Sequence, residues 1–281
     1  MEGAIIMKNA RVFWGWMLLV LMFAAAIGSP TLAQTAEEQY VIGTYNIHIG
    51  KGMDGKLDLK RIANVIQTNK ADVIGLQEVD RLTTRCQRID QIAELKKLTN
   101  KEGVFGKSID YQGGEYGIGI LTSGRILKSE HRLFPEGKED ERRSFIAAQI
   151  ELGEDAVFWA LNTHLSLVAE DRAAQAKILL DYAKSLPGPV LIFGDFNDTP
   201  DSNPLKDLLA TPNLFDVLKL KFGNDIEKTY TYFFKKKLQI DYILVSKPLK
   251  DLFKDAGVER RGMYEIDTLS NGAEHRFDTI T

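Results

Sequence analysis

Short apolar stretches recur along the chain, and they alternate with segments in which apolar residues return every three or four positions. Stretches rich in Val, Ile, Leu and aromatic residues predict strands. They lie at residues 40–47, 73–76, 117–121, 144–150, 157–165, 190–193 and 240–245. Apolar residues at helical spacing predict helices. These lie at residues 59–66, 89–98, 173–186 and 205–209.

The order of these elements indicates the fold class. Strands and helices alternate in the first half of the chain, whereas paired strands dominate the centre, so we expect an α/β protein with mixed sheets covered by helices. Asp58 is placed to cap the first helix, and Pro204 suits the first turn of the last one. No linker rich in Pro, Gly or Ser divides the chain, so residues 34–281 are predicted to form one catalytic domain.

The N-terminal segment has a different pattern. Lys8 and Arg11 precede an uncharged apolar run over residues 12–27, which gives way to small residues ending at Ala33. This order predicts a secretory signal peptide over residues 1–33, cleaved near Ala33 or Ala36. An uncleaved N-terminal membrane anchor is the alternative, and both interpretations place the domain outside the cytoplasm, in the periplasm or the extracellular space.

Composition narrows the classes of function. The chain has 281 residues, of which 44% are hydrophobic and 27% charged, and this is enough to bury a full core. Its net charge is −3, and because the leader carries +1, the remainder carries −4. This net negative charge argues against nonspecific binding of long nucleic acids. A single cysteine, Cys86, excludes an internal disulfide and is expected to be a packing residue.

Carboxylates and amides stand where buried strands are predicted to end. Glu78 follows the run over residues 73–76, and alternation along the strand places it on the side of Leu76. An ionised group there requires a cation, unless it turns into solvent. Asn46 ends the first predicted strand and has a turn residue as its alternative role. Asp195 and Asn197 project to one face and are suited to align water and a phosphoryl oxygen, or to form an Asx turn.

Two histidines complete the candidate chemistry. His164 closes a predicted strand, where it is either structural or a hydrogen-bond donor to a phosphate. Asp241 lies inside an apolar run and needs a partner, for which His275 is the candidate. A carboxylate that orients an imidazole favours its charged form, which suits contact with a dianionic transition state.

Together these residues resemble the endonuclease/exonuclease/phosphatase superfamily, which includes DNase I-like nucleases, inositol polyphosphate phosphatases and bacterial sphingomyelinases. The resemblance spans residues 40–278 and preserves the family's chain order. Its motifs are Thr44-Tyr45-Asn46, Gln77-Glu78, Tyr116 within residues 115–119, Asn162-Thr163-His164-Leu165, Gly194-Asp195-Phe196-Asn197, Ile240-Asp241-Tyr242 and Glu274-His275. The resemblance implies a four-layer α/β/β/α sandwich with two mixed, mainly antiparallel sheets.

The resemblance also implies roles for individual residues. Glu78 would be the principal ligand of a divalent metal, with Asn46 and Glu274 close to the metal or the phosphate. Oxygen ligands of this kind favour Mg²⁺, or Mn²⁺ or Ca²⁺, over zinc. In the catalytic set, Asp195 would activate water, Asn197, His164 and Tyr116 would contact the phosphate, and Asp241 with His275 would stabilise the transition state.

Three positions depart from the family pattern. Glu274 and Phe277 stand where the family usually has Asp and Pro, and a misplacement of about 1 Å can reduce a rate ~100-fold. His48 stands where some nuclease branches have a further metal-binding Asp, which argues against a second tight metal site.

Arginines suggest a positively charged rim around an acidic body. Arg81 is the candidate substrate contact among them, and solvated surface arginines are the alternative; the set comprises Arg81, Arg85, Arg88, Arg142 and Arg143. A basic and aromatic cluster over residues 233–237 is expected in a hairpin loop, where it would contact a nucleic acid or, equally, a lipid head group. We therefore expect a monomeric, exported, metal-dependent hydrolase of small-molecule or lipid phosphate esters, with a diester preferred over a monoester. A secreted nuclease and a catalytically impaired binding module of the same fold are the alternatives.

Overall fold

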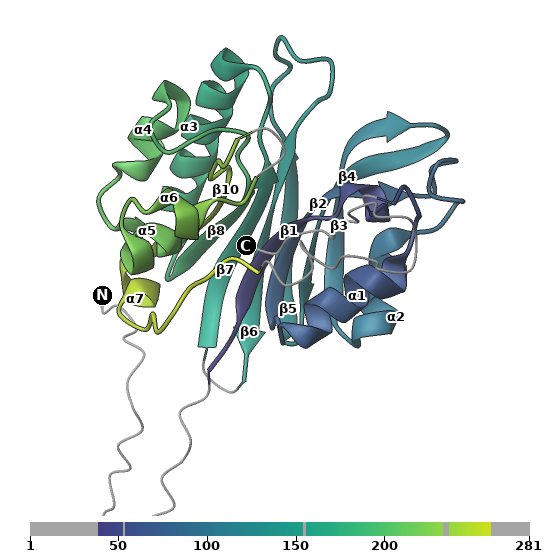
Figure 1. Cartoon of the computed structure of the whole chain (residues 1–281), viewed down its shortest axis with the longest axis horizontal. Coiled ribbons are helices and arrows are strands. Elements are labelled where there is room, and N and C mark those ends of the chain that lie inside the picture. The colour runs from purple at the N-terminus through teal and green to yellow at the C-terminus, as the bar shows by residue number, and fades with distance from the viewer. Residues whose placement is uncertain (1–38, 53, 154–155, 233–235, 260–281) are drawn as a thin grey trace, which may run out of the picture. The chain divides into compact units, whose positions relative to one another are not determined.

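Two β-sheets lie face to face in the computed structural model, which describes residues 39–52, 54–153, 156–232 and 236–259 (Figure 1). The first sheet has four strands in the order β1-β2-β4-β3. Its strands are β1 (Ile42–Asn46), β2 (Val73–Arg81), β3 (Glu102–Tyr111) and β4 (Gly114–Thr122). The pair β1 and β2 is parallel, whereas the other pairs are antiparallel.

The second sheet has six strands in the order β5-β6-β7-β8-β10-β9. These are β5 (Arg125–Leu133), β6 (Ser144–Leu152), β7 (Ala156–His164), β8 (Val190–Asp195), β9 (Leu214–Asp216) and β10 (Asp241–Ser246). Only β7 and β8 are parallel among these described strands. The predicted pair of mixed, mainly antiparallel sheets is confirmed.

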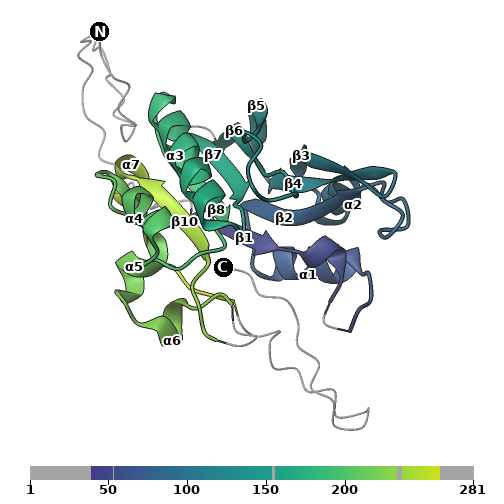
Figure 2. The same ribbon diagram turned by 90° about the horizontal axis from the view of Figure 1, so that it is seen from above.

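Helices cover the outer face of each sheet, as Figure 2 shows from a second direction. On the first sheet, α1 (Leu59–Thr68) and α2 (Gln91–Thr99) pack over one apolar core, and on the second, α3 (Ala169–Ser185) and α4 (Asn203–Leu209) pack over another. A third core lies between the sheets. These three cores produce the four layers that the resemblance implied.

Capping explains where the helices begin. Asp58 accepts hydrogen bonds from the backbone N–H groups of Lys60 and Arg61, which confirms the predicted cap of α1. Asp90 does the same for α2 through the N–H of Ala93, and Pro204 lies in the first turn of α4. Short elements complete the described residues: η1 (His48–Gly50), α5 (Val217–Phe222), α6 (Ile226–Thr229) and α7 (Lys247–Lys250). No described helix has the length and apolar character needed to cross a membrane.

The strands that the sequence pattern did not predict are β3, β5 and β9. All of them lie at an edge of their sheet, where side chains meet solvent and the apolar pattern is weak. Most residues of β5 are exposed, and β9 has only three residues. The predicted central strands all correspond to observed ones, because burial on both faces requires a continuous apolar run.

A buried polar bridge joins the two sheets. The Asn162 side chain of β7 donates to the carbonyl oxygens of Leu76 (3.0 Å) and Gly119 (2.7 Å) in the first sheet. Its Oδ1 accepts from Gln77 Nε2 at 2.6 Å, and the same nitrogen donates to Thr44 Oγ1 at 3.0 Å. Both amide side chains are fully buried. The bridge therefore fixes the register of one sheet against the other at the end where β1, β2, β7 and β8 finish.

Removing the bridge should destabilise the fold. We expect Asn162→Leu to lower the free energy of unfolding by about 2 to 4 kcal/mol, because Gln77 Nε2 and two carbonyl groups lose a buried partner. The change is measured by urea denaturation followed by circular dichroism. Asn203→Leu, at an exposed position of α4, is the matched control, with an expected change below about 0.5 kcal/mol. Equal stability of the two variants would contradict a structural role for the bridge.

Candidate active site

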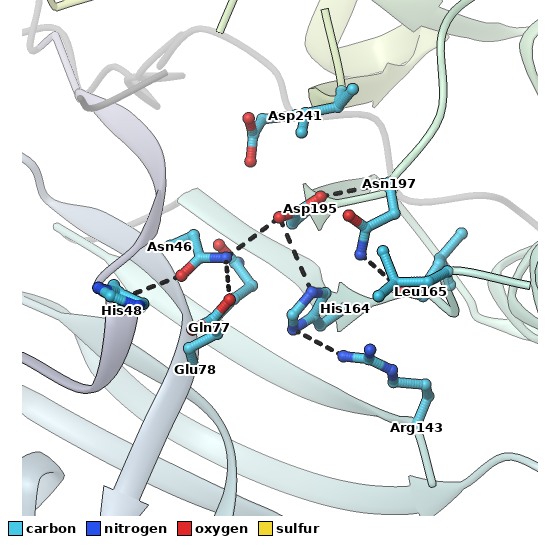
Figure 3. Close-up of polar contacts among 12 residues, drawn as sticks. Asn46, His48, Gln77, Glu78, Arg143, His164, Leu165, Asp195, Asn197 and Asp241 are labelled. Carbon is cyan, nitrogen blue, oxygen red and sulfur yellow. Dashed lines mark hydrogen bonds and ion pairs between the residues drawn. The ribbon is translucent and has the colours of Figure 1, made fainter. Parts of the chain in front are cut away.

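The candidate residues meet where the strands of the two sheets end, because the directions of the strands bring these ends to the same side of the molecule. Asn46, His164 and Asp195 end β1, β7 and β8, while Asp241 begins the antiparallel strand β10. Register places His164 beside Asp195 and Asp195 beside Asp241. Figure 3 shows these side chains and Glu78 of β2 turned toward a common space. Sequence reasoning had predicted that all five belong to one site, and the fold brings them together.

The Asn46 side chain connects the two sheets at this site. Its Nδ2 donates to Glu78 Oε1 at 2.9 Å in the first sheet and to Asp195 Oδ2 at 3.1 Å in the second. Its Oδ1 accepts from the backbone N–H of His48 at 3.0 Å, which orients the amide (Figure 3). One amide group thus holds two carboxylates near each other.

Glu78 owes its position to a β-bulge. The register of β2 against β4 shifts between Leu76 and Val79, and Glu78 has a φ of 55°. Leu76 and Val79 both lie in the core under the helices, so the regular alternation used to place Glu78 is wrong. A non-glycine residue in the left-handed region stores strain, and such residues concentrate at functional sites. The bulge, which the sequence pattern did not predict, therefore directs this carboxylate.

Asp195 is buried and has an unusual electrostatic environment. Burial raises its pKa to about 6, and the charge of Glu78 acts in the same direction. Hydrogen bonds from Asn46 and from the backbone N–H of Asn197 oppose that rise. The carboxylate is thus held in one orientation, with a pKa suited to accept a proton near neutral pH.

Asp241 adds a third acidic group. Burial and the charge of Asp195 raise its pKa well above the usual value, while a hydrogen bond from Thr231 has the opposite effect. Its predicted partner His275 and the predicted metal ligand Glu274 both lie outside the described residues.

Asn197 is held by the adjoining loops. Its φ of 52° places it in the left-handed region, which Asn adopts more readily than most residues. Its Nδ2 donates to the carbonyl oxygen of Leu165 at 2.9 Å, and its backbone N–H donates to Asp195 Oδ1 at 2.9 Å. Asn197 therefore joins the loop after β7 to the loop after β8 beside the site.

Tyr116 lies in β4, and its hydroxyl group donates a hydrogen bond to Glu141. The pKa of Tyr116 is raised by burial and by the charges of Glu78 and Glu141, so the hydroxyl stays protonated. It is consequently a hydrogen-bond donor at the acidic side of the site.

Most of the predicted arginine rim is engaged within the protein. Arg81 pairs with Glu115 and lies over the ring of Phe105, 4.5 Å from its centroid. Arg85 pairs with the fully buried Asp80 at 2.7 Å. Arg88 donates to backbone carbonyl groups. The expected hairpin around residues 233–237 is flanked by a bridge between Tyr232 and Leu238, with residues 233–235 outside the described part.

Arg143 is the site residue whose role sequence reasoning missed. It was predicted to belong to a surface rim, but it is only 5% exposed, and its Nη1 lies 3.1 Å from Nδ1 of His164. The other ring nitrogen of His164 lies 3.8 Å from Asp195 Oδ2. No sequence signal pairs Arg143 with His164, because the contact depends on the register of β6 and β7.

The donor set fits a hard divalent cation. Glu78, Asp195 and Asp241 bring three carboxyl groups to one place, and the pKa values of both aspartates are raised in part by neighbouring carboxylates. The described residues contain no group of three His, Cys, Asp or Glu side chains able to hold a metal alone. Carboxylate and amide oxygens are the donors that a hard divalent cation binds, so Glu78 and Asn46 fit such an ion.

Comparison with known proteins agrees with the geometry. A model of the Endonuclease/Exonuclease/phosphatase family matches residues 43–263. No curated protein matches the chain in sequence.

Solved structures share the fold at low sequence identity. An endonuclease/exonuclease/phosphatase from Beutenbergia cavernae DSM 12333 has a TM-score of 0.63 and 20% identity, covering 85% of this chain and 69% of that one. TDP2 from Caenorhabditis elegans has a TM-score of 0.62 and 18% identity, covering 86% and 73%. A mannosyl-6-phosphatase from Bacteroides thetaiotaomicron VPI-5482 has a TM-score of 0.57 and 16% identity, covering 74% and 85%.

Neutralising Asp195 should stabilise the metal-free protein. Its pKa of about 6 exceeds the value of about 4 in an unfolded chain, so its contribution to stability is lost as pH rises through this window. We expect Asp195→Asn to raise the free energy of unfolding by about 1 to 3 kcal/mol at about pH 7.5, and by much less at about pH 4.5.

Urea denaturation in EDTA at both pH values measures this difference. Asp181→Asn, on the exposed side of α3, is the control and should change stability little at either pH. A gain for Asp195→Asn that is independent of pH would show that the effect does not arise from the raised pKa.

Proposed function

Because the chain belongs to the endonuclease/exonuclease/phosphatase family, we propose that it is a divalent-metal-dependent phosphodiesterase that acts as a monomer through in-line attack of water. The observation that carries this proposal is the Asn46 amide, which joins Glu78 of one sheet to Asp195 of the other. A candidate metal ligand and a candidate base are thereby held side by side.

Glu78 and Asn46 are the described residues that would hold Mg²⁺, with Glu274 as a further predicted ligand. When bound, the metal supplies a positive charge that polarises the phosphoryl oxygen. The bulge holds Glu78 in a fixed direction, and the contact with His48 orients the Asn46 amide. Both side chains are therefore preorganised, which reduces the reorganisation needed when the ester binds.

Asp195 is the group proposed to receive a proton from the attacking water. Its Oδ1 accepts from the backbone N–H of Asn197, while its Oδ2 accepts from Asn46, so the carboxylate has little freedom to rotate. A raised pKa makes it a stronger base than an ordinary aspartate. His164 and Tyr116 are the proposed donors to the phosphate oxygens, and Asp241 with His275 is proposed to stabilise the transition state.

A diester suits the charge of this site better than a monoester. The charges of Glu78 and Asp195 already act on each other there, while the nearby cation Arg143 is paired with Glu139. A diester brings one negative charge, whereas a monoester brings nearly two at neutral pH. The electrostatic repulsion is therefore smaller for the diester.

Hydrolysis of a generic ester tests the proposal. The protein without residues 1–33 should hydrolyse bis(4-nitrophenyl) phosphate with Mg²⁺ or Mn²⁺, but not with EDTA, and faster than the corresponding monoester. We expect Glu78→Gln and Asp195→Asn to lower kcat/KM by about 100-fold or more, since each removes a group that acts on the reacting phosphate or water. Release of nitrophenolate is the measurement.

Glu94→Gln and Asp181→Asn are matched controls, because both acidic residues lie on exposed helix surfaces. Their kcat/KM should stay within about twofold of wild type. Cleavage of plasmid DNA as the dominant activity would favour the nuclease instead. Inertness toward diesters, monoesters and natural phosphates, without rescue by Glu274→Asp, would favour the binding module.

We also propose that the protein is exported by its N-terminal segment, on the strength of Lys8, Arg11 and the apolar run that follows. Expression of the whole chain in a bacterial host should yield a mature protein beginning at Gln34 or Glu37, as measured by intact mass after cell fractionation. An exported protein that keeps residues 1–33 would indicate the membrane anchor, and an uncleaved cytoplasmic protein would contradict export.

A further inference from the structure

The contact between Arg143 and His164 determines which imidazole nitrogen carries the proton. Arg143 Nη1 and His164 Nδ1 are 3.1 Å apart, and both residues are nearly buried. A guanidinium group has only donors and does not lose its proton in proteins. Nδ1 must therefore accept the hydrogen bond with its lone pair. A neutral imidazole with an unprotonated Nδ1 carries its single proton on Nε2.

The protonated nitrogen faces the candidate active site. His164 Nε2 lies 3.8 Å from Asp195 Oδ2, a distance too long for a hydrogen bond. Among the described residues, the structure gives Nε2 no other hydrogen-bond partner. The N–H is thus directed at the side of the proposed base, where an oxygen of a bound phosphate would find a donor (Figure 3).

Arg143 cannot easily turn away from the imidazole. Its Nε and Nη2 donate to the two carboxylate oxygens of Glu139, at 3.1 and 2.7 Å, and Nη1 also lies 2.7 Å from Glu141 Oε1. The backbone N–H of Glu139 in turn donates to Asp171 in the first turn of α3, at 2.8 Å. The planar guanidinium is held on several sides, which a lysine ammonium could not reproduce.

We propose that Arg143 is a positioning residue that keeps His164 neutral, with its proton on Nε2, so that the imidazole is a fixed hydrogen-bond donor to the substrate phosphate. The part of this proposal that concerns phosphate rests on the proposed function, whereas the tautomer follows from the contact itself. His164 would then differ from His275, for which a charged imidazole is predicted.

The same contact disfavours the imidazolium form of His164, so His164 does not act as a general acid from that form. Adding a proton to Nδ1 would set an N–H against the N–H of Arg143 and would place two positive charges together. Burial and the charge of Arg143 both lower the pKa of His164 well below its usual value, in agreement with this geometry.

Nitrogen-15 NMR of the histidine rings tests the tautomer without any need for activity. The chain has four histidines, so His164→Gln assigns the signal of interest by its disappearance. In the wild-type protein we expect His164 Nδ1 to show the downfield shift of an unprotonated nitrogen and Nε2 that of an N–H, unchanged between about pH 5 and pH 8. A proton on Nδ1, or titration of the ring between about pH 5 and pH 8, would overturn the proposal.

Arg143→Met and Arg142→Met are the variant and its matched control, since the one hydrogen bond of the Arg142 side chain to a described residue goes to the backbone carbonyl of Phe134. We expect Arg143→Met to mix the tautomers, to bring the titration of His164 toward its usual range, and to lower kcat about 10- to 100-fold with little change in KM. Arg142→Met should alter neither the spectrum nor kcat.

The possible results separate the two proposals. If the wild-type spectrum is as expected but no phosphate ester is hydrolysed, the tautomer stands and the proposed function fails. If Arg143→Met is folded and keeps both the wild-type spectrum and kcat, Arg143 is not a positioning residue. If this variant does not fold, the wild-type spectrum and its pH dependence still test the tautomer.

Discussion

The site depends on hydrogen bonds that pass between two separate sheets. Asn162 and Gln77 fix the sheets against each other in the buried interface, and Asn46 connects their carboxylates at the edge immediately beyond. Neither sheet contains the site alone. A shift of one sheet relative to the other would change the distance between Glu78 and Asp195. The buried hydrogen bonds that prevent this shift therefore also maintain the geometry of the site.

Repulsion among the acidic residues of the site is the second constraint on the structure. The fold gathers Glu78, Asp195 and Asp241, burial penalises the charge of the two aspartates, and the backbone at Glu78 is strained. The nearby guanidinium of Arg143 is committed to two glutamates and to His164. The site therefore lowers the stability of the fold, as is common at functional sites, where binding of a ligand can relieve such repulsion.

The sequence predicted the central strands, the main helices and the shared location of the acidic residues, because burial imposes a pattern that can be followed along the chain. Edge strands such as β5 were not predicted, since exposed strands lack that pattern. The bulge at Glu78 was not predicted either, because it depends on how β2 pairs with β4. Arg143 and His164 are both visible in the sequence, but their contact is a product of tertiary register. Local patterns therefore located the site without giving its internal geometry.

Each sheet contains one parallel pair formed by a strand, a helix and a returning strand: β1, α1 and β2 in the first, and β7, α3 and β8 in the second. Both pairs deliver their site residues at the carboxyl ends of the strands. The opposite ends of these strands carry none of these side chains, and the turn just before β8 is exposed at Pro187 and Gly188. This side of the molecule is accordingly the place to attach a label, a surface tether or a fused domain without covering the candidate active site.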